Sequence, residues 1–213
     1  MESKDYWNKV ADEKNFSTPF QIEILSKYIG SAMKILDVGC GYGRTLRELY
    51  DRGYRNLIGI DFSSKMIERA SSLNPNILFE LTDGKRLDFE DNSIDCVILL
   101  AVLTCIIDED SQKALIREIH RILKNGGILY INDFLVNDSD MYLKRYERYK
   151  DTYSQYGIFE TDDGGVFRHH SEEYLDELLS DYDCLEKKKL KYKTMNGHIS
   201  NGIYYIGKKN KGE

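Results

Sequence analysis

The chain has 213 residues, and its 30 lysines and arginines against 36 aspartates and glutamates give a formal net charge of -6. This length, without a Pro/Gly/Ser-rich linker, predicts one domain with its own hydrophobic core. The negative charge opposes binding to a phosphate backbone, so we expect no nucleic-acid partner.

The N-terminal sequence MESKDYWNKV lacks the apolar segment of a signal peptide, and no stretch approaches the length and apolarity of a membrane span. The four cysteines have no spacing typical of metal ligands. We therefore expect reduced thiols in a cytoplasmic protein, without a metal site and without membrane contact.

Residues 1–30 predict two N-terminal helices. The first covers residues 3–14, and the second begins at Thr18-Pro19-Phe20-Gln21. Thr18 is a suitable N-cap, Pro19 fits the first helical position, and Gln21 is placed to reach back to the cap.

Short apolar segments alternate with helical ones over residues 31–136. Five segments rich in isoleucine, valine and leucine predict buried strands: 34–38, 56–60, 77–81, 94–100 and 127–133. Helices are predicted between them at 43–52, 63–73 and 109–123. This alternation predicts a Rossmann-like α/β fold, a mostly parallel sheet with helices on both faces.

Residues 137–170 interrupt the alternation and predict an insertion after the fifth strand. A helix is expected over about residues 138–156, followed by the loop GIFETDDGGVFRHH. Helical geometry places one set of tyrosines on a single face, at positions 142, 146, 149, 153 and 156. A charged set is expected on the opposite, solvated face, namely Lys144, Arg145, Glu147, Arg148 and Lys150.

Residues 171–208 predict a final helix, capped by Ser171, and a hairpin formed by residues 182–194 and 199–208. The hairpin completes a seven-stranded sheet whose last strand is antiparallel. The basic run KKKLKYK at 187–193 lies in the first of these strands, and lysines of this kind typically protect a sheet edge from pairing.

The sequence LDVGCGYGR follows the first strand directly. Its glycines at 39, 41 and 43 permit a sharp turn and a close approach to a ligand, and the next helix points its N-terminus at the same place. Asp61 ends the second strand twenty residues after Gly41, the spacing at which an acidic side chain accepts hydrogen bonds from ribose hydroxyls. Together these features predict an adenosine-type ligand.

A dinucleotide fingerprint requires a further glycine at position 44, which is Arg44 here. The observed G-x-G-x-G with Asp37 before it resembles the first motif of the class I S-adenosylmethionine-dependent methyltransferases. The resemblance continues through IGIDFSSKMIERA, the TDG turn at 82–84, the strand IDCVILLAVLTC and LKNGGILYIND, and thus covers residues 34–133 in order.

This resemblance implies S-adenosylmethionine as cofactor and assigns roles to individual residues. Asp37, Gly39 and Gly41 would face the methionine moiety, and Asp61 would bind the ribose. The remaining expected cofactor contacts are Phe62 and Met66 beside the adenine, Asp83 at its exocyclic amine, and Cys40, Gly84, Ala101, Tyr6 and Trp7. Tyr6 and Trp7 are included because an N-terminal aromatic segment often folds over the cofactor in similar enzymes.

Thr104 and Cys105 stand where many such enzymes carry a histidine after the fourth strand, so no catalytic base is expected there. If the acceptor must lose a proton, the candidate bases are Asp133, at the end of the fifth strand, and His169 and His170. The histidines have a free pKa of about 6.5, which suits proton transfer near neutral pH. A polar loop without a catalytic role is the alternative for the histidine pair.

The sequence as a whole predicts a methyltransferase that transfers a methyl group to a small-molecule acceptor by in-line displacement. The alternatives are an NAD(P)-dependent oxidoreductase, which Arg44 disfavours, and a protein that binds S-adenosylmethionine without turnover. The tyrosine helix is expected to act as a lid over the site. A dimer seam is the alternative because its spacing is also that of a heptad, so the chain is expected to be a monomer or a homodimer.

Overall fold

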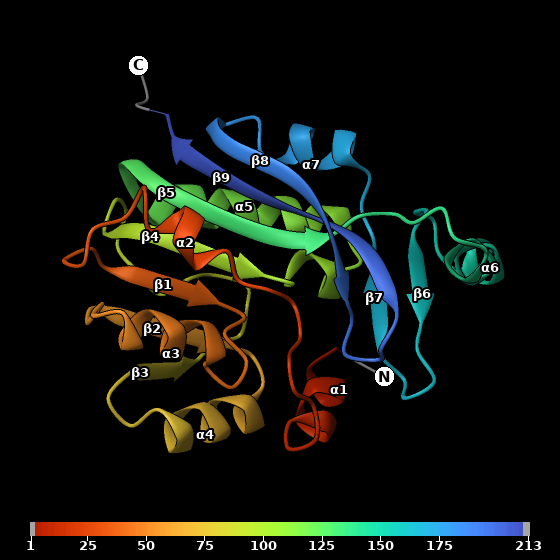
Figure 1. The fold of residues 1–213 in the computed structure, drawn as a ribbon, viewed down its shortest axis with the longest axis horizontal. Helices are drawn as coiled ribbons and strands as arrows, with labels where there is room; N and C mark the ends of the chain where they lie inside the picture. The colour runs from red at the N-terminus through yellow and green to blue at the C-terminus, as the bar shows by residue number, and fades with distance from the viewer. Residues whose placement is uncertain (1–2, 211–213) are drawn as a thin grey trace.

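A single seven-stranded sheet forms the centre of the computed structural model, which describes residues 3–210 (Figure 1). The strands are β1 (Ile35–Val38), β2 (Leu57–Asp61), β3 (Leu78–Leu81), β4 (Ile94–Leu100), β5 (Leu123–Phe134), β8 (Tyr182–Lys193) and β9 (Ile199–Lys209). Their order is β3-β2-β1-β4-β5-β9-β8, and β9 runs antiparallel to both of its neighbours. The predicted Rossmann-like sheet with an antiparallel last strand is confirmed.

Helices cover both faces of this sheet because successive strand residues point to opposite sides. Ile35 packs on one side with α2 (Ile22–Leu25) and α3 (Arg44–Asp51). Leu36 packs on the other side with α5 (Glu109–Ile122) and α7 (Glu172–Leu178). The N-terminal α1 (Ser3–Val10) packs against α4 (Ser64–Leu73), which lies beside β3.

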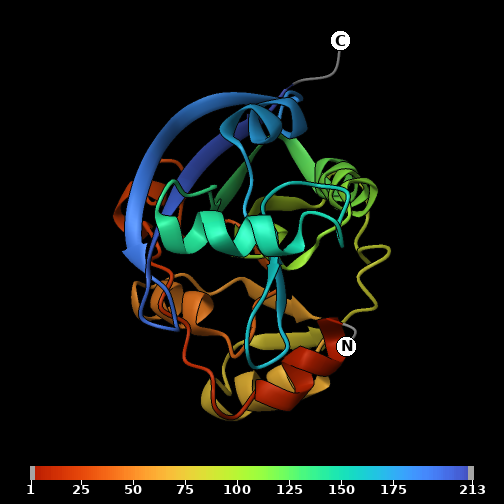
Figure 2. The ribbon, with the colours of Figure 1, turned by 90° about the vertical axis from the view of Figure 1, so that its right-hand side faces the viewer.

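The insertion after β5 lies beyond the ends to which the parallel strands point (Figures 1 and 2). It contains α6 (Asp140–Tyr149) and a separate two-stranded sheet formed by β6 (Ile158–Glu160) and β7 (Val166–Arg168). The helix is shorter than predicted, and the segment expected to be a loop is a β-hairpin. Because the helix ends at Tyr149, Tyr153 and Tyr156 do not belong to the helical stripe.

The N-terminal region also differs from the prediction in two places. The first helix ends at Val10, and the second begins only at Ile22, so Thr18 does not cap it. Gln21 makes no capping bond; its side-chain oxygen instead accepts hydrogen bonds from Tyr130 Oη at 2.6 Å and Asn132 Nδ2 at 2.8 Å. Because the Gln21 side chain binds these two polar groups of β5, it is not available for the predicted capping bond.

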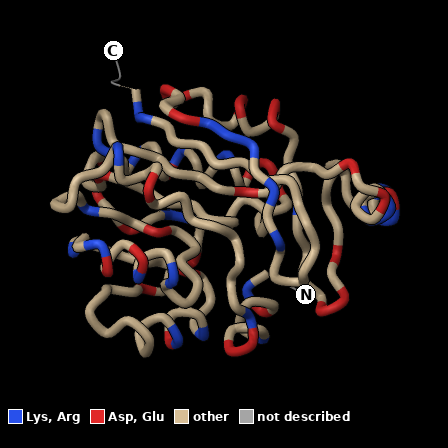
Figure 3. Tube along the Cα trace, viewed as in Figure 1, with Lys and Arg blue, Asp and Glu red and all other residues tan. Residues whose placement is uncertain are grey.

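The basic strand β8 is an edge strand with exposed lysines, as predicted from its sequence (Figure 3). Lys187 forms ion pairs with Glu172 and Asp176 of α7 at 3.1 and 2.8 Å, and Lys189 also pairs with Glu172. The helix Glu172–Leu178 is capped by Ser171, whose hydroxyl accepts from Tyr174 N, as expected. None of the described helices is both long and apolar enough to cross a bilayer.

Candidate functional site

The glycine-rich turn follows β1 in the predicted position. Gly39 and Gly41 have φ values of 72° and 53°, in the left-handed region that favours glycine. A Cβ atom on Gly39 would lie 2.7 Å from Val102, and one on Gly41 would collide with the Phe16 ring. The turn therefore leaves space for a ligand only because both positions lack a side chain.

Asp61 connects this turn to the end of β2. One of its carboxylate oxygens accepts from Gly41 N at 2.9 Å, and the other accepts from Ser63 N at 2.8 Å. Burial raises the pKa of Asp61, and these backbone N–H groups oppose the shift. Asp61 lines the cavity, and a carboxylate oxygen can accept more than one hydrogen bond, so the side chain could also accept from a ribose hydroxyl.

Asp37 lies beneath the turn and is 1% exposed. Neither of its carboxylate oxygens has a hydrogen-bond partner within residues 3–210. Burial, followed by the nearby Asp61 charge, raises the pKa of Asp37 to about 8, and the Arg44 charge opposes this shift. A buried carboxylate without a partner fits a ligand that brings a positive charge, such as the ammonium of a methionine moiety.

The remaining predicted cofactor residues separate into two groups. Trp7, Phe62, Met66 and Ala101 line the cavity together with Gly39, Gly41 and Asp61. Five predicted residues are absent from its lining: Asp37, which lies beneath the turn, and Tyr6, Cys40, Asp83 and Gly84. Asp83 is exposed and accepts from Lys85 N at 2.9 Å, the geometry of a turn-forming side chain. Tyr6 donates to Asp163 in the insertion at 3.2 Å, which helps to hold α1 near the cavity.

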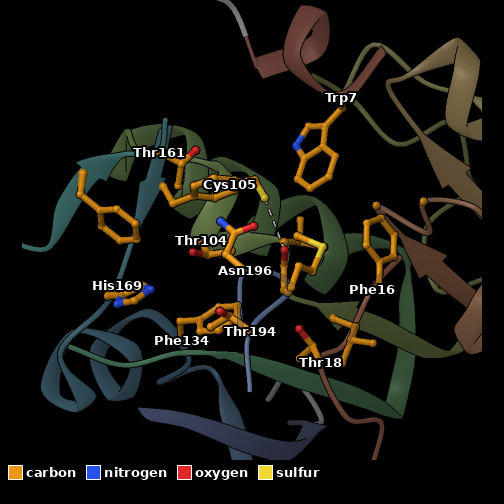
Figure 4. Close-up of a pocket in the computed structure, with 18 of the residues that line it drawn as sticks. Trp7, Phe16, Thr18, Thr104, Cys105, Phe134, Thr161, His169, Thr194 and Asn196 are labelled. Atoms are coloured by element: carbon orange, nitrogen blue, oxygen red, sulfur yellow. Dashed lines mark hydrogen bonds between the residues drawn. The ribbon is translucent and has the colours of Figure 1, made fainter. Parts of the chain in front are cut away.

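About 1070 Å³ of empty space, part of it open solvent, lies between the lining residues, which extend from the glycine turn to α6. Trp7 and Phe16 lie on one side, and His169 and Phe134 lie on the other, with Thr104 and Cys105 between them (Figure 4). We call the part nearer His169 the acceptor half. Burial raises the pKa of the Cys105 thiol, so it stays protonated and is a poor nucleophile.

His169 belongs to a buried network that fixes its tautomer. Asn137 Nδ2, which can only donate, lies 3.3 Å from His169 Nδ1, and Tyr146 Oη, which accepts from Asn137 N at 3.2 Å, lies 2.7 Å from the same nitrogen. His169 Nδ1 is therefore the acceptor, and the ring proton lies on Nε2. Burial, with the neighbouring His170 and Arg145 charges, lowers the pKa of His169 to about 3. The expected pKa near 6.5 is thus corrected: His169 is neutral and acts as a hydrogen-bond donor through Nε2.

Asp133 and His170 lie behind the cavity and are absent from its lining. Asp133 is fully buried and accepts from Thr104 N at 3.2 Å and Phe134 N at 2.8 Å; burial raises its pKa to about 7. His170 Nε2 lies 2.9 Å from Gln112 Nε2, and burial lowers the pKa of His170 to about 3. These contacts hold both side chains outside the cavity lining.

The sequence reading missed several residues that line the cavity. Arg145 was expected on the solvated face of its helix, yet it is half-buried and lines the acceptor half. Tyr142 lines the same region, and Phe159 and Phe167 are added by the β6–β7 hairpin. The tip of the β8–β9 hairpin contributes residues 194–196 and 198. The sequence did indicate that Arg145 could lie near the cavity, because it follows Tyr142 by three residues and helical residues three apart are neighbours.

Comparisons with known proteins agree with this geometry. The sequence profile of a family described as a methyltransferase domain matches residues 35–127. A solved S-adenosylmethionine-dependent methyltransferase from Methanosarcina mazei is similar in structure, with a TM-score of 0.83 and 27% identity over 88% of this chain and 97% of that chain. The PH0226 protein of Pyrococcus horikoshii shares the fold with a TM-score of 0.69 and 20% identity, over 89% of this chain and 87% of its own.

Curated relatives are similar over shorter stretches. An "eEF1A lysine and N-terminal methyltransferase" of Bos taurus is 30% identical over 142 residues. The match covers 59% of this chain but only 20% of the length of that relative. A "Sterol 24-C-methyltransferase erg6" of Aspergillus fumigatus is 31% identical over 52% of this chain and 30% of its own length. The matched profile, the strand order and the glycine turn with its buried carboxylates all agree. Residues 35–127 therefore form a methyltransferase domain, and the chain has the fold of the class I S-adenosylmethionine-dependent methyltransferases, which points to S-adenosylmethionine as its cofactor.

Proposed function

We propose that this chain transfers the methyl group of S-adenosylmethionine to a small-molecule acceptor held beneath α6 and the β6–β7 hairpin. The observation that carries the proposal is the continuous cavity between the glycine turn and His169, which is covered by the N-terminal region, the insertion and the tip of the β8–β9 hairpin. Covering segments of this kind suit an acceptor that enters whole and is shielded from water.

The proposed cofactor contacts follow from the chain's own groups. Asp37 holds the ammonium of the methionine moiety, Asp61 holds the ribose, and Trp7 and Phe62 provide aromatic walls. Bound S-adenosylmethionine supplies a methyl group that is already activated on a sulfonium. The chain then has to position the acceptor and exclude water, and positioning alone can lower a barrier by roughly 7 to 11 kcal/mol.

Among the lining residues described, Asp61 is the sole carboxylate, and His169 already accepts at Nδ1, which leaves its Nε2 proton as the group available to a ligand. We therefore propose that the acceptor arrives already nucleophilic and that His169 Nε2 orients it. In this proposal Asp133 and His170 support the site from behind and are not bases.

The test is to incubate the protein with methyl-labelled S-adenosylmethionine and, separately, the low-molecular-weight and protein fractions of a cell extract. We expect the label to enter the low-molecular-weight fraction only. Gly39→Val serves as the control, since its side chain would collide with Val102 in the cofactor turn. Label in the protein fraction would refute the small-molecule proposal.

Calorimetric titration with S-adenosylhomocysteine and with NAD accompanies this test. Binding of the former without label transfer to either fraction would favour the cofactor-binding protein without turnover. Binding of NAD alone would favour the oxidoreductase alternative.

A further inference from the structure

The acceptor half of the cavity has an unbalanced charge. Arg145 contributes a cation to its lining, while the one lining carboxylate within residues 3–210, Asp61, lies at the glycine turn and accepts from Gly41 N and Ser63 N. The second lining arginine, Arg44, also lies at that end, where it pairs with Glu48 at 3.1 Å. The acceptor half therefore carries positive charge without a compensating negative group.

The immediate contacts of Arg145 are two aromatic rings and one imidazole nitrogen. Its guanidinium carbon lies 5.5 Å from the ring centre of Tyr142 and 5.6 Å from that of Phe159. Its Nη2 lies 3.4 Å from His198 Nε2, and because a guanidinium only donates, the histidine nitrogen is the acceptor in this contact. Within the described part of the chain, no carboxylate forms an ion pair with Arg145.

A half-buried guanidinium without a counter-charge favours an anionic ligand. The planar fork of arginine matches a carboxylate, and loss of hydration at a partly enclosed site strengthens the pairing. An ammonium ligand would instead place a second cation beside Arg145 with no lining carboxylate to offset it, which is unfavourable. The amine acceptor named for the eEF1A relative is therefore a poor match for this half of the cavity.

The remaining lining residues indicate the shape and polarity of the acceptor apart from its charged group. Phe134, Phe159 and Phe167 provide aromatic walls, and His169 Nε2 provides a neutral donor between them. Resting on the proposed methyl transfer, we propose that the acceptor is a small aromatic carboxylic acid whose carboxylate binds Arg145. A second, already nucleophilic atom of the acid forms the bond to the methyl group as the bond from the sulfonium breaks, and S-adenosylhomocysteine leaves. Tyr142 and Phe159 then hold the guanidinium in place by cation–π contacts while the acid binds.

The test measures binding of matched probes in the presence of saturating S-adenosylhomocysteine. Benzoate and 2-naphthoate are compared with their primary amides and with benzylamine by calorimetry and thermal shift. A charge-assisted pair predicts acids that bind about tenfold to a hundredfold more tightly than their amides. Benzylamine is expected to bind most weakly.

Three variants separate the role of Arg145 from general effects. Arg145→Gln should abolish the difference between acid and amide, and Arg145→Lys should retain part of it. Arg148→Gln removes an exposed arginine of the same helix and should leave the preference intact. The affinity for S-adenosylhomocysteine is measured for each variant and should stay within about twofold of the wild-type value.

The outcomes distinguish this inference from the function on which it rests. If S-adenosylhomocysteine fails to bind the wild-type chain, the proposed methyl transfer itself fails. If it binds, the acid inference alone is overturned by equal binding of acids and amides, by tighter binding of benzylamine, by the failure of every acid to bind, or by a preference that survives Arg145→Gln.

Discussion

The buried carboxylate of Asp37 should lower the stability of the cofactor-free chain while it enables cofactor binding. Burial raises the pKa of Asp37 from 3.8 to about 8, so the folded state holds this proton more tightly than the unfolded state does. The stability penalty is absent below pH 3.8, grows as the pH rises, and becomes constant above about pH 8. At about 1.4 kcal/mol per pH unit, the penalty at pH 7 is about 4 kcal/mol.

Asp37→Asn replaces the carboxylate by an amide that is neutral at every pH. The free energy of unfolding of the variant should therefore exceed that of the wild type by an amount that grows from pH 4 to pH 8. Urea denaturation of both proteins at several pH values measures this difference in the free energy of unfolding. Groups that titrate in the same way in both proteins do not contribute to the difference. The same variant should bind S-adenosylmethionine about tenfold to a hundredfold more weakly, because the ammonium loses its charged partner.

Asp95→Asn is the matched control on the neighbouring strand β4. Burial alone would raise the pKa of Asp95, but hydrogen bonds from Lys124 Nζ at 2.7 Å and Lys34 N at 2.9 Å lower it overall. Its contribution to stability is present above pH 3.8, so Asp95→Asn should destabilise the chain evenly from pH 5 to pH 8. A difference for Asp37→Asn that does not grow with pH, or full cofactor affinity in that variant, would refute the reasoning.

Three further predictions concern the cofactor, the insertion and the acceptor. Asp61→Ala should weaken binding of S-adenosylmethionine by about 1 to 3 kcal/mol through lost hydrogen bonds to ribose, and calorimetry showing unchanged affinity would remove Asp61 from the site. Hydrogen exchange of residues 138–165 should slow when cofactor and acceptor bind; full protection in the free chain, explained by a dimer interface, would favour the seam over the lid. His169→Gln keeps a donor near the Nε2 position and should retain turnover within about tenfold, well above His169→Leu. Equal losses of about 10²- to 10⁴-fold in both variants would indicate a base.

The glycine turn and the carboxylates near it could be predicted because the backbone specifies them. Gly39 and Gly41 need positive φ values, and Asp61 needs only to end a strand at the right distance from the turn. Both requirements appear in the local sequence. Asp83 had an equally plausible position for binding adenine. Aspartate is also common in exposed turns, and only the tertiary structure distinguishes a turn-forming aspartate from a ligand-binding one.

The insertion was harder to predict because distant contacts determine it. The tyrosine spacing indicated a helix and continued past its end at Tyr149, after which Tyr153 donates to Glu160 of β6 at 2.8 Å. Tyr156 packs against Tyr146 from outside the helix, 5.2 Å between ring centres. The hairpin did have a local signal, since Asp163-Gly164 is a dipeptide typical of tight hairpin turns.

The contrast between local sequence motifs and distant contacts also applies to the two halves of the site. The proposed cofactor half lies in the segment 35–127 that matches the family profile, and its expected contacts are the backbone of the glycine turn and the carboxylates of Asp37 and Asp61. The acceptor half depends on Arg145, Tyr142 and His169, which lie in the insertion beyond that segment. Relatives named for lysine and for sterol acceptors match this chain over about half its length or slightly more. Under the proposed function, acceptor specificity resides in groups that the shared motifs do not fix, and we propose the charge of Arg145 and the Nε2 proton of His169 as two such groups.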